Sequence, residues 1–378
     1  MVVVKKQLAS IALHFEDLED PRVTRTQYHP LINVVVIGIC AVICGAQHFT
    51  EMEEFGKKKR DWLARFLDLR HGIPSHDTFN GVFARLKPEQ FEKCLLSWLT
   101  ALQEITGGQV LAIDGKTLRG SYDTADSRAA IHMVSVWATA NHLSLGSVVV
   151  DEKSNEITAI PKLLELIDIN GALVTIDAMG CQKEIARKIV KEGGDYALAV
   201  KENQPKLHEA VSDFFAEQLE ENFADTPHRY HETHEKGHGR VEHRYYYLAP
   251  VPDDFPVRDQ WKNLKALGMA INITEQNGHE TSEVRYYILS KYVGGQRFAD
   301  AVRSHWSIEN HLHWQLDVTF REDDLRIRKG HAPANMSILM RTALSLLKKE
   351  TTLRRGMSTK RLVAGWDEDY LEKVLTGQ

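Results

Sequence analysis

Regular spacing of hydrophobic residues predicts helices over the first part of the chain. Apolar positions recur three and four residues apart in residues 31–44, 51–69 and 79–102, as they do on the buried face of a helix. Ser75 or Asp77 is placed to cap the start of the last of these helices. The chain therefore opens with a helical region.

The pattern then changes to short apolar runs that are typical of buried strands. Strands are predicted at residues 110–114, 131–139, 143–150, 172–177 and 196–201, with helices at residues 155–169 and 183–191. The first three strands would pair as antiparallel neighbours, and the last two are each reached through a helix. This implies a mixed sheet with helices on its faces. The order fits a ribonuclease-H-like core, and it also fits other α/β folds.

A second strand-rich stretch interrupts this scheme. It begins with an acidic helix at residues 207–220, and β-branched and aromatic residues then predict strands at residues 241–249, 264–276 and 282–290. Helical periodicity returns at Phe298 and continues to the end of the chain. We therefore expect an N-terminal helical domain (1–105), the first part of an α/β core (106–205), a β-rich insertion (206–292), and the second part of the core with a basic helical tail (293–378).

Composition narrows the class of protein. The chain has 378 residues, of which 43% are hydrophobic and 26% charged, and these values exclude collagen, a disulfide scaffold and wholesale disorder. Its four cysteines are too few for a disulfide framework, so a reducing cytoplasm is the expected setting. In the first ten residues the apolar residues come before the lysines, which is the reverse of a signal peptide. The apolar stretch 31–46 is shorter than the roughly 20 residues that cross a bilayer. We expect no membrane partner.

Charge is distributed unevenly. The formal net charge is −5, yet residues 321–361 contain eleven Lys and Arg against four Asp and Glu. A basic surface on an acidic protein is a typical binding site for a polyanion. A solvated helical surface explains the same count, as it does for the basic cluster at residues 57–60.

Two aspartates follow apolar runs of the predicted core. Asp114 ends the first strand and Asp177 ends the fourth. If these strands are parallel neighbours, both side chains emerge at one edge of the sheet, where they repel each other unless a cation lies between them. Oxygen ligands of this kind suit Mg²⁺ or Mn²⁺, and a pair of ions roughly 3.5–4 Å apart can cleave a phosphodiester. An aspartate at a strand end is also commonly a turn or helix-capping residue.

A third acid, Glu309, lies in a predicted amphipathic helix. It shares a helical face with His305, Leu312 and His313, which predicts a half-buried acid that needs a partner such as a metal ion. The alternative is a solvated charge on a helix surface. Trp306, on the same helix, is expected to be part of the core, as is Trp314.

Several motifs resemble one known family. AIDGKTLRGS, DEKSNEITAIP, TIDAMGCQ, GGDYALAVKENQ, KGHGRVEHR and RSHWSIENHLHWQLDVTFREDD resemble the DDE transposases of bacterial insertion sequences, in the branch of the H-repeat-associated proteins linked to Rhs elements. The resemblance covers nearly the whole chain. It implies a ribonuclease-H-like core split by a β-rich insertion, and a site for Mg²⁺ or Mn²⁺, with two ions, formed by Asp114, Asp177 and Glu309.

The resemblance also implies partners and a reaction. The partners are double-stranded DNA, at the element ends and at the target, and a second copy of the chain in a homodimer on DNA. The reaction is in-line phosphoryl transfer: cleavage at an element end, then attack of the freed 3′-hydroxyl on target DNA. The protein would be bacterial and cytoplasmic, and nucleoid-associated when it is bound to DNA. The chain contains no GxxxxGK[ST] phosphate loop, so no nucleotide is expected.

Basic residues near these motifs are candidate DNA contacts. They are Lys116, Arg119, Lys201, Arg240, Arg303, Arg326 and Arg328. The chain departs from related transposases around the third acid, where Val302, His305 and Leu316 occupy positions that often hold Tyr, Arg and Lys. No helix-turn-helix can be identified for binding the element ends.

Other functions stay open at this point. The chain could be an inactive DNA-binding relic of an insertion element, or a metal-dependent nuclease without strand transfer. Its 18 histidines also raise a zinc site as an alternative, in the cluster His231, His234, His238 and His243 or around Glu309. His234 and His238 have the i, i+4 spacing of a chelating pair, but Gly237 and Gly239 predict a loop there.

Overall fold

A nine-stranded mixed sheet runs along the computed structural model, which describes residues 11–102, 109–122, 129–140, 143–150, 156–237 and 239–377. The strands are β1 (Val110–Leu118), β2 (Ile131–Ala138), β3 (Leu143–Val150), β4 (Leu173–Ile176), β5 (Asp195–Val200), β6 (Arg229–Gly237), β7 (Arg240–Pro250), β8 (Ala266–Gln276) and β9 (His279–Leu289). Their order across the sheet is β3-β2-β1-β4-β5-β9-β8-β7-β6.

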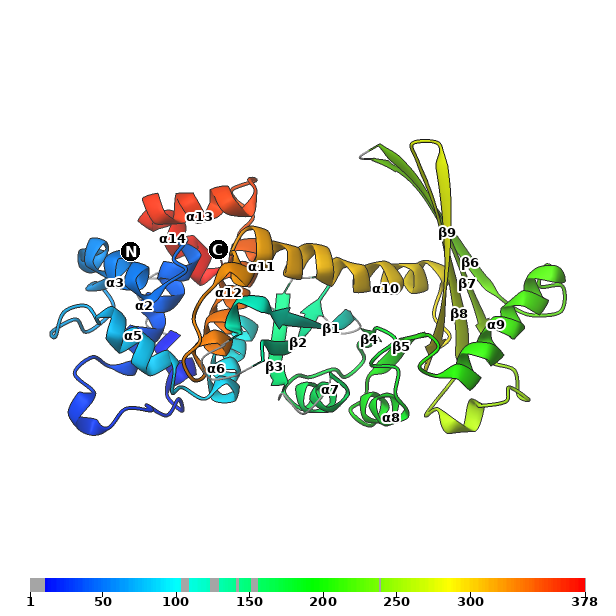
Figure 1. The fold of residues 1–378 in the computed structure, drawn as a ribbon, viewed down its shortest axis with the longest axis horizontal. Coiled ribbons are helices and arrows are strands. Elements are labelled where there is room, and N and C mark those ends of the chain that lie inside the picture. The colour runs from blue at the N-terminus through cyan, green and yellow to red at the C-terminus, as the bar shows by residue number, and fades with distance from the viewer. Residues whose placement is uncertain are drawn as a thin grey trace.

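Helices precede, connect and follow these strands (Figure 1). They are α2 (Leu31–Ile43), α3 (Phe49–Lys58), α4 (Arg60–Leu63), α5 (His76–Phe83), α6 (Pro88–Ala101), α7 (Glu156–Glu165), α8 (Lys183–Lys191), α9 (Pro205–Glu220), α10 (Gly295–Ile308), α11 (Trp314–Val318), α12 (Ala332–Lys349), α13 (Met357–Trp366) and α14 (Glu368–Thr376). A π-helix (Glu309–His313) joins α10 to α11 in one continuous helical run.

The first five strands form one half of the sheet, with β3 at its edge and β5 in the middle. β1 is parallel to β4 and β4 is parallel to β5, whereas β2 pairs antiparallel with both β1 and β3. Parallel neighbours need a crossover connection, and α7 and α8 provide the two that are required. The predicted mixed sheet with helices, preceded by an N-terminal helical region, is confirmed.

The two faces of this half of the sheet are covered by different helices (Figure 1). On one face, α7 and α8 pack in a core that includes Ile113, Val134, Ile160 and Ile185. On the other face, α10 lies along the sheet and contacts β1 and β4. Successive side chains of a strand point to opposite faces, so residues next to Ile113 in β1 point toward α10.

The region predicted as a β-rich insertion continues the same sheet. β9 pairs antiparallel with β5, and β8, β7 and β6 follow as antiparallel neighbours. Their hairpins rise above α10 in Figure 1. Three strands were predicted here and β6 was missed, because its sequence, RYHETHEKG, is polar and largely exposed, as suits an edge strand.

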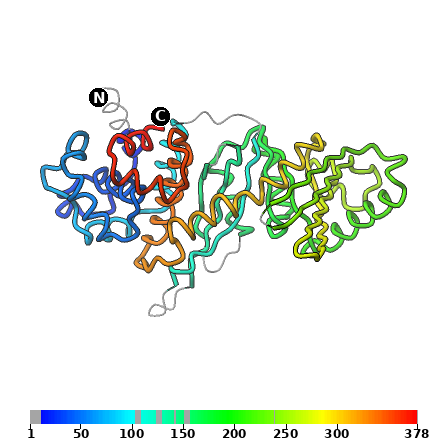
Figure 2. Tube along the Cα trace, turned by 90° about the horizontal axis from the view of Figure 1, so that it is seen from above, coloured from blue at the N-terminus to red at the C-terminus, as the bar shows by residue number. Residues whose placement is uncertain are grey.

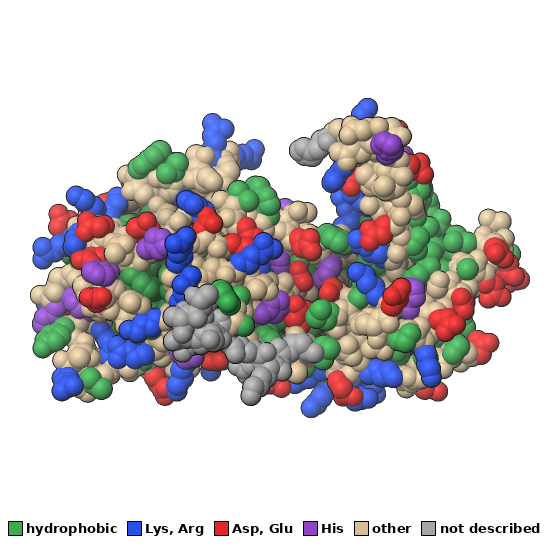
Figure 3. Space-filling view, in the orientation of Figure 1, with side chains coloured by type: hydrophobic (Ala, Val, Ile, Leu, Met, Phe, Trp, Pro, Cys, Tyr) green, Lys and Arg blue, Asp and Glu red, His purple; other side chains and the backbone are tan. Residues whose placement is uncertain are grey.

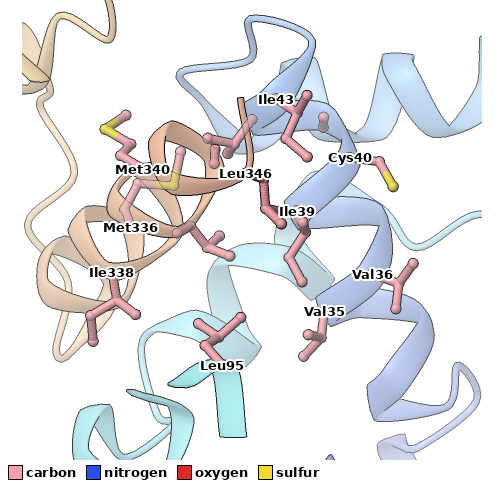
Figure 4. Packing of buried hydrophobic residues seen from close by; sticks show 14 of the residues in the cluster. Val35, Val36, Ile39, Cys40, Ile43, Leu95, Met336, Ile338, Met340 and Leu346 are labelled. Carbon is pink, nitrogen blue, oxygen red and sulfur yellow. The ribbon is translucent and has the colours of Figure 1, made fainter. Parts of the chain in front are cut away.

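The two ends of the chain fold together. The helices α2, α5 and α6 share one core with α12, and α12 is buried from Ala332 to Leu347. Figure 4 shows Leu346 of α12 pointing toward Ile39 of α2, and Figure 2 shows this end of the molecule from above. The helical tail is therefore packed against the N-terminal helices instead of being a separate arm.

Two predicted helices are broken in the structure. Residues 79–102 form α5 and α6, because Pro88 has no backbone N–H and starts a new helix at its first position. Residues 51–69 form α3 and α4 followed by turns. Ser75 is the N-cap of α5, and its hydroxyl accepts a hydrogen bond from the backbone N–H of Thr78.

In the part of the chain that the structure describes, no helix is long and apolar enough to span a bilayer. The apolar segment that begins at Leu31 is α2, which is buried against α12.

Candidate active site

Asp114 and Asp177 lie side by side on the face of the sheet under α10. The parallel register of β1 and β4 ends with Ile113 opposite Ile176, and the two aspartates are the next residues on their strands. β4 ends at Ile176, so Asp177 follows the strand as predicted. Asp114 does not end its strand, because β1 continues to Leu118 in pairing with β2. The prediction of a strand end was wrong for Asp114, while the expected neighbourhood is present.

Burial changes the acidity of both carboxyls. It raises the pKa of Asp114 to about 7, and the nearby acids Asp177, Glu156 and Glu309 act in the same direction. Burial also raises the pKa of Asp177, with Glu156 adding to the shift. Backbone N–H groups compensate partly by donating to the carboxylates: Gly115 N–H to Asp114 Oδ1 at 2.9 Å, and Gly180 N–H to Asp177 Oδ1 at 3.2 Å, with Met179 also lowering the pKa of Asp177.

Glu309 begins the π-helix that lies over these aspartates. Four residues before it, His305 Nδ1 lies 3.4 Å from Thr175 Oγ1 of β4. Four residues after it, His313 Nδ1 lies 3.6 Å from Asp114 Oδ2. Glu309 therefore lies between two contacts that fix the helical run to β4 and β1.

Glu309 itself is exposed, so the prediction of a half-buried acid was wrong. The π-helix inserts a wider turn into the helical run, which shifts the face that regular helical spacing assigns. The expectation that Trp306 and Trp314 belong to the core also fails, since they are 40% and 52% exposed. The guanidinium of Arg285, from β9, lies 4.0 Å from the ring centroid of Trp306.

The carboxylates are suited to a divalent cation by their chemistry. Their oxygen atoms are the donors that Mg²⁺ and Mn²⁺ prefer, and Asp114 and Asp177 are half-buried acids that a cation would stabilise. Over the described residues, no Lys or Arg pairs with Asp114, Asp177 or Glu309. Over the same residues, no three His, Cys, Asp or Glu side chains already surround one metal position. The acids are neighbours, without the geometry of a preformed cage.

Glu156 and His132 belong to this neighbourhood and were not identified from the sequence. Glu156 begins α7, and its Oε1 lies 2.6 Å from His132 Nε2 of β2. The carboxylate acts on the pKa of both aspartates. Glu156 lies within the DEKSNEITAIP motif, which was the available signal, but its partner comes from a strand that the motif does not contain.

Lys116, a predicted DNA contact, is buried and paired within the protein. Its Nζ lies 2.6 Å from Asp317, 3.1 Å from Asp323 and 3.6 Å from Glu322. This prediction is corrected, because the ammonium group has no free path to a phosphate. The partners lie in a different segment of the chain, so the position of Lys116 beside Asp114 in sequence gave no sign of them.

The other candidate DNA contacts lie at the surface. They are Arg119, Lys201, Arg240, Arg303, Arg326 and Arg328. Lys201 is near enough to Asp177 to oppose the rise in its pKa. The side chain of Arg119 is 83% exposed and lies 3.7 Å from Asp323.

A groove of about 1020 Å³ separates α10 from the raised hairpins (Figure 3). Arg240 and Arg303 both line it, together with Arg244, Arg285 and Arg297. Several of these guanidinium groups are paired with glutamates, such as Arg303 with Glu235 at 2.6 Å and Arg240 with Glu242 at 3.4 Å. The groove is therefore rich in arginine side chains, and several of them are already paired with glutamates.

The excess of basic residues near the C-terminus is partly internal. Arg341, Lys360 and Arg361 are buried, and Arg341 Nη1 lies 2.7 Å from Glu322 Oε1. The expected basic face is reduced accordingly. In the basic cluster at residues 57–60, Lys57 pairs with Glu53 at 2.8 Å and with Glu54 at 2.7 Å.

The histidines of the insertion lie on an exposed hairpin. His234 and His243 face each other across β6 and β7, with their Nδ1 atoms 2.5 Å apart. His238, which the i, i+4 spacing would pair with His234, lies outside the described residues. Of the described side chains, no set of three joins this pair in a zinc site.

Comparison with known proteins gives the chain a family. Residues 105–346 match the family model described as Transposase DDE domain, and residues 12–99 match the model described as DDE_Tnp_1-associated. The chain is 40% identical over 376 residues to "H repeat-associated putative transposase YhhI" of Escherichia coli (strain K12), covering 98% of this chain and 99% of that protein.

A second relative and one solved structure are also similar to the chain, but only the relative supports an argument about it. The chain is 41% identical over 351 residues to "Putative transposase YncI" of Escherichia coli O157:H7, covering 92% of this chain and 89% of that protein. The solved structure of a piggyBac transposase synaptic complex with hairpin DNA covers 98% of this chain and 78% of its own, with 11% identity and a TM-score of 0.36. A likeness this remote carries no argument.

Proposed function

The chain belongs to the family of transposases with a DDE domain, and on this premise we propose that it cuts DNA at the ends of a mobile element and joins those ends to target DNA. The proposed catalytic acids are Asp114, Asp177 and Glu309, on a core of the ribonuclease-H-like type. The single observation that supports the proposal most is the adjacency of Asp114 and Asp177 at the end of the β1–β4 register, under the helical run that carries Glu309.

Two divalent ions complete the proposed site. When bound by Asp114, Asp177 and Glu309, Mg²⁺ or Mn²⁺ would supply Lewis-acid polarisation and neutralise charge on the phosphoryl oxygens. The protein's part is to hold the carboxylates in place. The N–H groups of Gly115 and Gly180 orient the two aspartates, and the contacts of His305 and His313 hold the helical run above them.

The reaction we propose has two in-line displacements at phosphorus. Water cuts the element end and leaves a 3′-hydroxyl, which then attacks a phosphodiester of the target DNA. Neither step uses a covalent bond between protein and DNA. Positioning and electrostatic stabilisation account for most of the catalysis in phosphoryl transfer, which fits a site that consists mainly of carboxylates.

We place the DNA backbone along the groove between α10 and the raised hairpins. A phosphate entering it would replace Glu235 as the partner of Arg303 and Glu242 as the partner of Arg240. Arg119, Lys201, Arg326 and Arg328 are further proposed contacts, because they are exposed. Two copies of the chain would hold two element ends. The N-terminal helical domain, the split core and the insertion remain the proposed division of the chain.

A cutting and joining assay tests the proposal. The substrate is duplex DNA from the ends that flank the gene, incubated with Mg²⁺, Mn²⁺ or EDTA. We expect metal-dependent cuts and joined products, both lost in Asp114→Asn. Asp254→Asn is the matched control, since Asp254 is exposed and belongs to no part of the site. Cutting that persists in Asp114→Asn would show that the proposed site is wrong.

The alternatives give different outcomes in the same assay. An inactive relic would bind the ends without cutting them, and a nuclease without strand transfer would give cut DNA with no joined product. The complete set of acids at neighbouring positions favours an enzyme, because a relic has no need of two adjacent, half-buried aspartates with raised pKa values.

A further inference from the structure

A fourth carboxylate lies against the backbone of the proposed site. Glu156 is the first residue of α7, and its side chain is 16% exposed. Its Oε1 lies 2.6 Å from His132 Nε2, and His132 Nδ1 lies 2.9 Å from Thr117 Oγ1 of β1. A carboxylate only accepts hydrogen bonds, so Nε2 of the imidazole carries the proton that is donated to Glu156. Thr117 and His132 together fix the orientation of the Glu156 side chain.

The residue after Asp114 has no side chain, and this makes room for the Glu156 carboxylate. A Cβ atom at Gly115 would lie 2.5 Å from His132 Nε2 and still closer to Glu156 Oε1. Both distances are shorter than a carbon atom tolerates, so any larger residue would force the carboxylate away. Glu156 is therefore packed directly on the strand position next to Asp114.

The carboxylate is close enough to interact with both aspartates. Its charge raises the pKa of Asp114 and of Asp177. Among the influences that raise the pKa of Asp177, Glu156 comes next after burial, while the backbone N–H of Gly180 acts more strongly in the opposite direction. A negative charge placed near two half-buried acids is unfavourable unless a cation is shared among them.

We propose that Glu156 is a fourth acid of the site, which ligates one of the two divalent ions and is positioned by His132. This rests on the proposed function. Two ions carry a charge of about +4, which three carboxylates leave partly uncompensated and a fourth balances. Hydrogen bonds that orient a ligand are a regular part of metal sites, and His132 provides one. In the alternative, the pair joins β2 to α7 and has no effect on metal binding.

Titration with Mn²⁺ in the absence of DNA distinguishes a metal-binding role of Glu156 from a purely structural one. The full chain, Glu156→Gln, Asp114→Asn and the control Glu165→Gln are titrated by calorimetry and by the electron paramagnetic resonance of free Mn²⁺. Glu165 lies on the same helix, is exposed, and pairs with Lys188 at 2.8 Å. We expect Glu156→Gln to weaken one of two Mn²⁺ sites by tenfold or more, while Glu165→Gln matches the unaltered chain.

Three further variants keep the test independent of folding and of the charge change. Gly115→Ala retains every carboxylate and displaces Glu156, so it should weaken the same Mn²⁺ site. His132→Ala should weaken that site by about 10–100-fold, and His132→Gln, which keeps an N–H donor, should restore part of the affinity. Far-ultraviolet circular dichroism checks that each variant is folded.

The outcomes distinguish this proposal from the proposed function. If Asp114→Asn loses Mn²⁺ binding while Glu156→Gln and Gly115→Ala bind as the unaltered chain does, the fourth acid is refuted and the metal site stands. If Asp114→Asn also binds Mn²⁺ unchanged, the metal site itself is refuted, and the role of Glu156 with it.

Discussion

The Nδ1 atom of His313 lies 3.6 Å from Oδ2 of Asp114 and thereby connects the helical run of the third acid to the strand of the first. Burial lowers the pKa of His313 to about 3, with Arg341 and Lys116 adding to the effect. The imidazole is therefore neutral at pH 7, and the contact is a polar one between a neutral ring and a carboxyl group. Two segments that are distant in sequence therefore meet at this pair.

We expect His313→Ala to reduce metal-dependent cutting by about 10–100-fold, because a displacement of about 1 Å at a catalytic group has effects of this size. The measurement is the single-turnover rate on end DNA. Val318→Ala, at a position that is 55% exposed on α11, is the control and should leave the rate unchanged. Equal rates for both variants would show that the His313 contact does not position Glu309.

Lys116→Met should destabilise the protein by roughly 3–5 kcal/mol, because it leaves Asp317, Glu322 and Asp323 without their common cation. Urea denaturation measures the change in the free energy of unfolding. Arg119→Ala serves as the comparison, since that side chain is 83% exposed and its loss should cost under about 0.5 kcal/mol. A Lys116 variant with full stability and weak DNA binding would restore the original prediction of a DNA contact.

The stability of the protein should fall as the pH rises through neutrality, owing to Glu92. This residue of α6 is buried, its Oε2 accepts a hydrogen bond from the Ser147 hydroxyl at 3.1 Å, and burial raises its pKa to about 7. Because the folded state favours the neutral carboxyl, this contribution is complete below about pH 4.5 and is lost as the pH passes about 7.

Glu92→Gln keeps the shape and removes the titration. We expect it to be more stable than the unaltered chain at pH 8, by up to about 3 kcal/mol, and nearly equal to it at pH 4.5. Denaturant melts at both values of pH measure this difference. A variant that is less stable than the unaltered chain at pH 8 would mean that the fold favours the charged carboxylate of Glu92, contrary to the raised pKa.

Arg303→Ala should weaken the binding of duplex DNA, and it should do so equally for end DNA and for unrelated sequences. Loss of one phosphate contact lowers the slope of log K against log salt by about 0.9. Fluorescence anisotropy over a range of salt concentrations gives this slope. Arg187→Ala, on α8, is the control, because that face of the sheet lies away from the groove. An unchanged slope in Arg303→Ala would remove the groove from the DNA path.

The strands β1 to β5 could be predicted from the sequence because they are largely buried and therefore contain nearly unbroken apolar runs. Asp114 and Asp177 were identified for the same reason, since a charge directly after such a run is conspicuous. β6 could not be predicted, because an exposed edge strand has no apolar face. Pro88 was visible, but the continuing apolar spacing masked the break that it causes.

The errors within the site have a common origin in partners that are distant along the chain. The partners of Lys116 lie near residue 320, and Glu156 is paired with His132 across a strand and a helix. The exposure of Glu309 depends on a π-helix, and the spacing of apolar residues does not indicate where a π-helix forms.

The central claim is that Asp114, Asp177 and Glu309 bind metal at one place, and affinity cleavage tests it most directly. Fe²⁺ replaces the divalent ion, and ascorbate with hydrogen peroxide then generates hydroxyl radicals that cut the polypeptide beside the bound iron. We expect fragments cut near all three acids, suppressed by excess Mg²⁺ and absent in Asp114→Asn. Cuts confined to the His234–His243 hairpin, or none that Mg²⁺ suppresses, would contradict the claim.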